Sequence, residues 1–161
     1  MTFALSIAKD SVYPLIQQFL KQCSSQLKSA LSYFFPHQTY SLMSQSIVAL
    51  ATSGTVTLEL ALFHVPTVMM YIMSSSNYFI AKNLVKLILP NYCLANIIAE
   101  KSVFPEFIQK MATPENIFAS LSNLLNISEH QKCIKECHTI EDRLRSSHAL
   151  KQAANLILEL L

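Results

Sequence analysis

The chain has 161 residues, of which 52% are hydrophobic and 14% charged, and its formal net charge is +2. A chain this apolar can offset the entropy lost on folding by burying side chains, which excludes a disordered protein. Its length is that of one domain large enough to form a hydrophobic core. A charge of +2 provides no strongly basic surface, which excludes nucleic acid as a partner. The composition holds one glycine, where average usage of ~7% predicts roughly eleven.

No segment of the sequence is typical of a membrane span or a signal peptide. A spanning helix needs about 20 consecutive, mostly apolar residues. The best candidate, residues 60–73, is shorter and contains His64 and Pro66. Lys9 and Asp10 interrupt the first 20 residues, where a signal peptide keeps an apolar run. We therefore expect a cytoplasmic protein whose four cysteines remain thiols.

Short apolar runs alternate with amphipathic segments over the first half of the chain. Runs of four to eight apolar residues predict buried strands, and apolar positions at helical spacing predict helices. The expected strands are residues 3–8, 30–35, 47–51 and 66–72, and the expected helices between them are 11–23, 38–45 and 56–63. This alternation predicts an α/β fold, a Rossmann-like parallel sheet with flanking helices.

The pattern becomes helical in the second half. We expect a helix over residues 77–87, a loop over 89–96, and a helix beginning at Thr113-Pro114-Glu115, where Thr caps and Pro suits the first turn. Two further helices are expected over 129–144 and 147–161. The expected domains are a partial nucleotide-binding domain, 1–126, and a helical C-terminal tail, 127–161, that packs back or exchanges between subunits.

The most informative segment runs from Ala51 to Glu59, because the lone glycine, Gly54, stands between a predicted strand and a predicted helix. Ligands of parallel sheets bind outside the carboxyl ends of strands, and a glycine there lets the backbone approach a phosphate at the helix N-terminus. Thr55 and Glu59 are four residues apart and share a helix face, where a carboxylate can accept hydrogen bonds from sugar hydroxyls. The alternative is that Gly54 only forms a turn and Glu59 only complements the helix dipole.

Five motifs in this order resemble the C-terminal half of lipid-A-disaccharide synthase. The resemblance is clearest over residues 42–125. The motifs are Ser53-Gly54-Thr55-x-x-Leu58-Glu59, Pro66-x-Val68-x-x-Tyr71, Ala81-Lys82-x-Leu84-Val85-Lys86, Leu94-Ala95-Asn96-Ile97-Ile98-Ala99 and Val103-x-Pro105-Glu106-Phe107-Ile108-Gln109.

The resemblance implies the C-terminal half of a glycosyltransferase of the two-Rossmann-domain (GT-B) type. That family transfers 2,3-diacylglucosamine from its UDP donor to 2,3-diacylglucosamine 1-phosphate, making the lipid A disaccharide with inversion. By this resemblance Ser53, Gly54 and Thr55 face the donor diphosphate, Glu59 binds ribose hydroxyls, and Asn96 lies near the donor. It also implies a lipid acceptor, a peripheral position on the inner membrane face, and a homo-oligomer. No cofactor and no metal are expected.

The sequence departs from the family pattern at two places. The family's Leu-Pro-Asn is Leu94-Ala95-Asn96 here, and its Gly-Arg or Gly-Lys is Glu100-Lys101. A carboxylate near a diphosphate site would oppose donor binding unless it points into solvent. The resemblance also implies an N-terminal acceptor domain that carries the catalytic base, and we expect this domain to be absent from the 161 residues. We expect a domain fragment, a split subunit or a decayed remnant that has no catalytic residue of its own and is inactive alone.

Other candidates carry weaker signals. The spacing Cys133-x-x-x-Cys137-His138 could place metal ligands on one helix face, but buried thiols are the commoner reason for it. We interpret His64 as a hydrogen-bonded core or loop residue. We interpret His37 as a structural residue, with the alternative that it approaches the cleft in which the ligand binds. Two rival functions stay open: the donor domain of another UDP-sugar glycosyltransferase, and a non-catalytic, membrane-associated interaction module.

Overall fold

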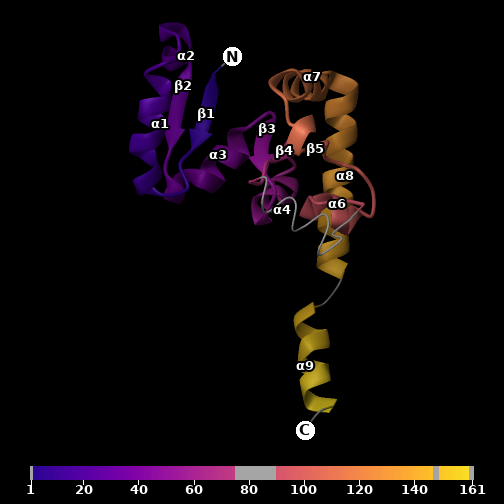
Figure 1. Ribbon diagram of the computed structural model, residues 1–161. Coiled ribbons are helices and arrows are strands. Elements are labelled where there is room, and N and C mark those ends of the chain that lie inside the picture. Colours follow the sequence, from indigo (N-terminus) through magenta and orange to yellow (C-terminus); the bar gives the residue numbers. More distant parts are fainter. Residues whose placement is uncertain (1, 75–89, 147–148, 160–161) are drawn as a thin grey trace. The chain divides into compact units, whose positions relative to one another are not determined.

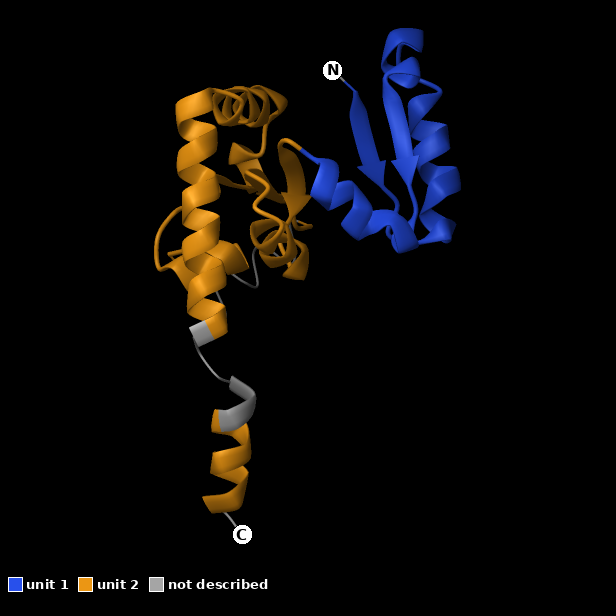
Figure 2. Cartoon of the chain, turned by 180° about the vertical axis from the view of Figure 1, so that it is seen from behind, with its two compact units in different colours: residues 1–46 blue, residues 47–161 orange. Residues whose placement is uncertain are grey.

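The computed structural model describes residues 2–74, 90–146 and 149–159. These residues form an α/β structure in which every described strand pairs in parallel with its neighbour (Figure 1). They divide into two compact units, Met1–Ser46 and Ile47–Leu161 (Figure 2). The predicted α/β class with parallel strands and flanking helices is confirmed, although the described strands lie in two sheets instead of one, one sheet in each unit.

The first unit is a two-stranded parallel sheet with its connecting helices. Its elements are β1 (Phe3–Ser6), η1 (Asp10–Val12), α1 (Tyr13–Leu20), α2 (Ser25–Ser29), β2 (Leu31–Phe34), η2 (Pro36–Gln38) and α3 (Thr39–Gln45). Aromatic rings hold α1 against β2, because the ring of Tyr13 lies 5.6 Å from those of Tyr33 and Phe35. Ile7, directly after β1, is fully buried. The two strands predicted here are therefore confirmed.

The second unit is built on a three-stranded parallel sheet of order β3-β4-β5. Its first elements are β3 (Ala49–Thr52), α4 (Thr55–Leu62), β4 (Thr67–Tyr71), α6 (Leu94–Ala99), β5 (Glu106–Ile108) and η4 (Gln109–Met111). The register aligns Ala51 with Met69 and Met69 with Glu106. Apolar side chains of the central strand are buried on both faces, as parallel sheets require, and Val68 and Met69 are both fully inaccessible.

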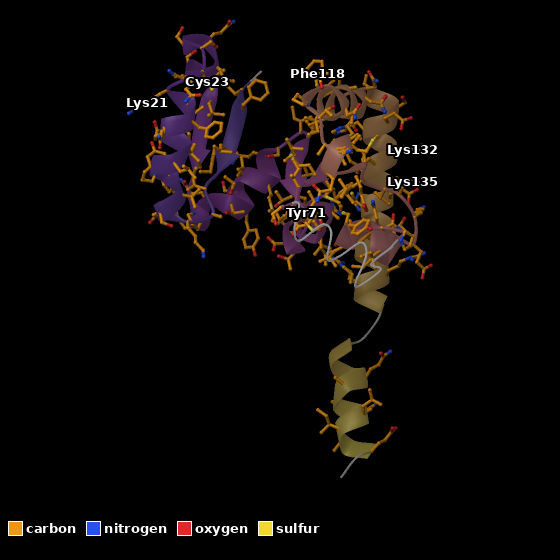
Figure 3. All side chains as sticks on the ribbon, viewed as in Figure 1. Lys21, Cys23, Tyr71, Phe118, Lys132 and Lys135 are labelled. Carbon is orange, nitrogen blue, oxygen red and sulfur yellow. The ribbon has the colours of Figure 1, made fainter. Side chains whose placement is uncertain are left out.

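Three helices follow, α7 (Pro114–Leu124), α8 (Ile127–Ser146) and α9 (Ala149–Glu159). The predicted start of α7 is confirmed, because the Thr113 hydroxyl accepts a hydrogen bond from the backbone N–H of Asn116 at 3.2 Å. The long helix α8 packs on α4, α6 and α7 (Figure 1). It buries Cys133, Cys137 and Ile140, which are spaced at helical intervals, while Phe118 projects from α7 into solvent (Figure 3).

Two of the predicted segments differ from the structure or cannot be compared with it. The predicted loop 89–96 already contains the first residues of α6, and the helix predicted over 77–87 lies outside the described residues. The predicted boundary after residue 126 falls between α7 and α8, which both belong to the second unit. Among the helices of the described ranges, none is long and apolar enough to cross a bilayer.

Candidate functional site at the turn between β3 and α4

The turn after β3 presents an open helix N-terminus. Gly54 has a φ of 144° and precedes the first residue of α4, so no side chain caps the free N–H groups there. A Cβ at this position would meet no other heavy atom of the described residues within 4 Å. Glycine is therefore required by the backbone conformation, and the space beside it is open to a ligand. Free N–H groups and the positive end of the helix dipole make this an anion-binding arrangement.

The flanking residues divide between exposed and partly buried positions. Thr55 is exposed at the first position of α4, and Glu59 is half-buried one turn further along the same face. In the part of the chain that the structure describes, the carboxylate of Glu59 makes no hydrogen bond or ion pair with another side chain or with the backbone. The Thr57 hydroxyl instead turns back and donates to the carbonyl of Gly54 at 2.8 Å. The turn is therefore fixed from within and leaves Glu59 available to a ligand.

Ser53 ties this turn to the segment that leads into α6. Its hydroxyl donates to the carbonyl of Tyr92 at 3.1 Å. The carboxylate of Glu106, on β5, accepts from the backbone N–H groups of Tyr92 at 2.9 Å and Cys93 at 3.0 Å. The negative carboxylate of Glu106 therefore already occupies the N-terminal end of α6, where the helix dipole favours an anion. Ser53 therefore connects the β3–α4 turn to the segment before α6, and its hydroxyl proton is engaged by the carbonyl of Tyr92.

Asn96 is fully buried and all its side-chain hydrogen-bonding capacity is used inside the protein. Its Nδ2 donates to the carbonyl of Phe104 and to Glu106 Oε1, both at 2.7 Å. Its Oδ1 accepts from the backbone N–H groups of Val103 at 2.9 Å and Phe104 at 2.8 Å. Asn96 holds the loop between α6 and β5, and so it positions Glu106. The resemblance implies a place near the donor for Asn96 but gives no sign of this network, although Asn96 and Glu106 both stand in motifs shared with the family.

Glu100, the carboxylate expected to conflict with a diphosphate, lies at the C-terminal end of α6. It ends α6 in the left-handed conformation, with φ 58° and ψ 23°. Ser53 contacts Tyr92, which precedes the N-terminal end of α6, whereas Glu100 follows the opposite end of this helix, about 9 Å further along its axis. Its carboxylate is mostly exposed and lies 3.6 Å from Arg143. A glycine suits this left-handed backbone better than a residue with a Cβ, so Glu100 strains the end of the helix.

The remaining candidates occupy separate places. His37 is exposed and, with Lys9, Asp10, Phe35 and Pro36, lines a hollow of about 590 Å³ at the carboxyl ends of β1 and β2. His64 is a loop residue whose Nε2 is hydrogen-bonded to Glu141 at 2.8 Å, as expected for a hydrogen-bonded histidine.

The two cysteines of α8 interact with each other within the core. A hydrogen bond between their thiols and burial both raise the pKa of Cys137. The same hydrogen bond lowers the pKa of Cys133, and burial opposes that effect. Both side chains are at least 95% buried, and His138, the third member of the sequence pattern, is mostly exposed. The pattern therefore reflects core packing, and the structure does not bring these three side chains together as one ligand set.

Comparison with known proteins matches nearly the whole chain to one family. The family model described as lipid-A-disaccharide synthetase matches residues 2–158. The chain belongs to this family. A lipid-A-disaccharide synthase of Persephonella marina is 33% identical over 153 residues, which cover 91% of this chain and 40% of that protein. Those of Gloeothece citriformis and Chlamydia trachomatis serovar D are 37% and 33% identical, over 70% and 92% of this chain and over 29% and 25% of those proteins.

The comparisons confirm the predicted resemblance to the lipid-A-disaccharide synthase family and extend it to both sides of residues 42–125. The chain spans between a quarter and two fifths of the length of the relatives named above. Family membership thus covers both compact units, including the hollow that His37 lines and the turn around Gly54.

Proposed function

We propose that this chain supplies the donor site of a lipid-A-disaccharide synthase, a glycosyltransferase of lipid A biosynthesis. The reaction would transfer 2,3-diacylglucosamine from its UDP donor to 2,3-diacylglucosamine 1-phosphate. The observation that carries this proposal is the uncapped N-terminus of α4 beside Gly54, in a chain of this family. Such a helix end binds phosphate through N–H groups that have no other partner.

Each residue around the turn has a role that follows from its position. The backbone N–H groups beside Gly54 and Thr55 would bind the diphosphate, and the Thr55 hydroxyl would add a donor. Ser53 would fix the turn through its hydrogen bond to Tyr92. Glu59, one turn further along α4, would accept hydrogen bonds from the two ribose hydroxyls. Charge-assisted hydrogen bonds of this kind are about twice as strong as neutral ones.

Asn96 would act indirectly in this proposal. Its amide holds the loop that carries Glu106, and Glu106 holds the backbone N–H groups of Tyr92 and Cys93. Through Tyr92 the same network reaches Ser53 and the turn. Asn96 is then a positioning residue that keeps its place near the donor without contacting it.

The remaining parts of the reaction would belong to the rest of the enzyme. Inverting transfer needs a base that takes the proton of the acceptor hydroxyl. In the family this base and the lipid acceptor site lie on the N-terminal domain, so residues 1–161 would bind the donor without forming product. The complete enzyme would work at the inner face of the membrane, where its lipid substrates reside, and as a homo-oligomer.

Calorimetric titration of UDP tests the proposed donor site. The full chain should bind UDP, and Glu59→Ala should lose about 1–3 kcal/mol of binding free energy, or roughly 5–150-fold in affinity. Uridine, which lacks the diphosphate, should bind more weakly than UDP to both proteins. Loss of the same factor for uridine would assign Glu59 to the nucleoside and not to the phosphates.

A matched control is Glu115→Ala, which removes an exposed glutamate from the first turn of α7. It should bind UDP as the parent does. Equal affinities of the parent and Glu59→Ala would remove the ribose role of Glu59, and absence of UDP binding by the folded parent chain would contradict the donor site.

A further inference from the structure

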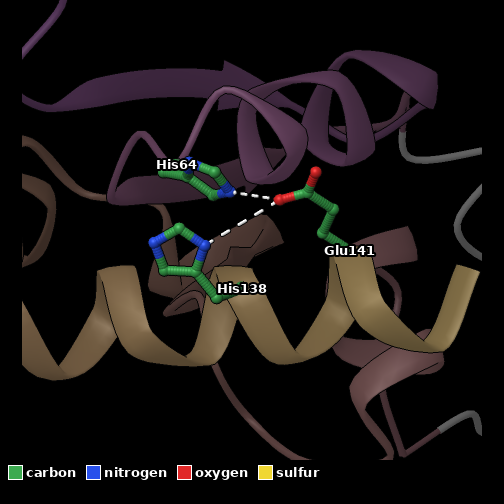
Figure 4. Close-up of side chains that lie close together, drawn as sticks. All are labelled: His64, His138 and Glu141. Carbon is green, nitrogen blue, oxygen red and sulfur yellow. Dashed lines mark hydrogen bonds and ion pairs between the residues drawn. The ribbon is translucent and has the colours of Figure 1, made fainter. Parts of the chain in front are cut away.

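Two histidines and one glutamate meet where the end of α4 faces α8 (Figure 4). His64 Nε2 lies 2.8 Å from Glu141 Oε2, and His138 Nδ1 lies 3.8 Å from the same oxygen. The three potential ligand atoms all lie within 4.8 Å of one another. The imidazole rings of His64 and His138 are 3.8 Å apart between centroids. Nothing in the proposed donor site uses these side chains.

We propose that His64, His138 and Glu141 bind a divalent transition-metal ion, with Zn²⁺ as the reference ion. Zinc binds imidazole nitrogen at 2.0–2.1 Å and carboxylate oxygen at about 2.0–2.2 Å, so neighbouring ligand atoms of a tetrahedral site are about 3.3 Å apart. The two distances to Glu141 Oε2 lie on either side of this value. The third pair, the two histidine nitrogens, lies within 4.8 Å, so side-chain rotations that also bring these nitrogens closer would place the three atoms around one ion.

The backbone places these ligands without any rearrangement of the fold. His138 and Glu141 are three residues apart on α8 and so share one face of that helix. His64 follows α4 in a left-handed conformation with φ 55°, which is uncommon for a residue other than glycine. The hydrogen bond from Val65 N–H to the carbonyl of Leu60 closes this helix end and fixes the direction of His64. Because α4 packs on α8, the ligands come from two elements already in contact.

Charges around the cluster favour one coordinating oxygen. Arg145 lies 2.6 Å from Oε1 of Glu141, so that oxygen is occupied and Oε2 remains for the ion. His64 Nε2 and Arg145 contact the two oxygens of this carboxylate and hold it in place from two sides. A bound ion would replace the proton on His64 Nε2, and that proton would pass to Nδ1 or to solvent.

The site keeps one side open. His138 is 57% exposed and Glu141 is 21% exposed, so solvent can reach the ion. Three protein ligands with nitrogen and oxygen donors leave a fourth position for water, which is the coordination of zinc outside closed structural sites. An ion here would connect the end of α4 to α8 and stabilise the second unit, because it binds the folded chain and not the unfolded one.

Titration of Co²⁺ into the full chain, followed by visible absorption, tests the proposal, and Zn²⁺ should displace the cobalt. We expect one ion per chain, a visible spectrum typical of four or five ligands, and no thiolate-to-cobalt charge-transfer band. His138→Ala and Glu141→Gln should each weaken binding at least tenfold. Zn²⁺ should also raise the thermal midpoint of the parent chain and leave that of His138→Ala unchanged.

The matched control is His130→Ala, which removes another histidine of α8 whose Nδ1 lies 3.1 Å from the carbonyl of Leu124. It should bind Co²⁺ with the affinity of the parent. His138 is the most exposed of the three ligands, so its variant is expected to fold. Equal affinity of His138→Ala and the parent would overturn the proposal. A thiolate band that disappears in Cys133→Ser would overturn it too, because the ion would then occupy the cysteines.

Discussion

At the residue scale, the side chain of Asn96 shows how a single amide can organise a loop. A buried amide is tolerated only when its hydrogen bonds are made inside the protein, and Asn96 makes four. Three of the four are with backbone groups of Val103 and Phe104, which belong to no helix or strand and would otherwise be left without partners. The remaining hydrogen bond holds Glu106, which in turn fixes the start of α6.

Replacing this amide should therefore destabilise the second unit. Asn96→Ala removes the acceptor of one buried and one partly buried N–H group and the donor to one buried carbonyl, and a buried group left unsatisfied costs about 1–3 kcal/mol. We expect a loss of roughly 3–5 kcal/mol in the free energy of unfolding, measured by urea denaturation. Asn123→Ala, at an exposed position on α7, should change it by less than about 0.5 kcal/mol. A loss below about 1 kcal/mol for Asn96→Ala would contradict the role assigned to this network.

At the scale of the elements, the shortage of glycine affects how helices end. Glycine is the usual residue in the left-handed conformation at the C-terminal end of a helix. The single glycine of this chain, Gly54, instead precedes α4. His64 and Glu100 adopt that conformation after α4 and α6, and Gln109 adopts it after β5. For a residue with a Cβ, the left-handed conformation is less favourable by about 1–2 kcal/mol. Two of the second unit's helix ends therefore carry local strain.

Glu100→Gly should relieve this strain at the end of α6. We expect the free energy of unfolding to rise by about 1 kcal/mol, because the left-handed penalty disappears and the exposed ion pair to Arg143 contributes little. The control is Lys135→Gly at an exposed position inside α8, which should lower it by about 1 kcal/mol. Denaturation of the three proteins by urea measures both effects. A Glu100→Gly protein as unstable as the Lys135→Gly protein would show that α6 does not end in this conformation.

Hydrophobic patterns predicted most elements but not the contacts that position the site. The strands β1 to β4 and the start of α7 were predictable, because apolar runs and a Thr-Pro-Glu start depend on local sequence. The strand β5 has three residues, and the predicted loop over 89–96 overlooked the start of α6, a helix of six residues. Segments this short contain too few residues for hydrophobic periodicity to show whether they form a strand or a helix. The contacts of Ser53 with Tyr92, and of His64 with Glu141, join residues 39 and 77 positions apart, which periodicity does not reveal.

At the scale of the whole molecule, each unit has its own buried residues, but the C-terminal helix has an exposed apolar surface. Ile157 and Leu158 on α9 are 61% and 68% exposed, and Ala153 and Ala154 precede them at helical spacing. These side chains form an apolar stripe along the described part of this helix. An apolar stripe of this kind is typical of a helix that packs against a partner.

Self-association through α9 is the prediction that follows. Full burial of a large apolar side chain contributes about 1.5–3 kcal/mol, so two from each copy contribute roughly 6–12 kcal/mol. Association costs about 4–15 kcal/mol, so pairing should be weak and detectable at micromolar concentration. Sedimentation velocity of the full chain should show a concentration-dependent dimer. The double variant Ile157→Lys, Leu158→Lys should sediment as a monomer, whereas Asn155→Lys, which adds a charge on the polar side of α9, should still associate. A parent chain that stays monomeric across this range would show that the stripe does not pair two copies.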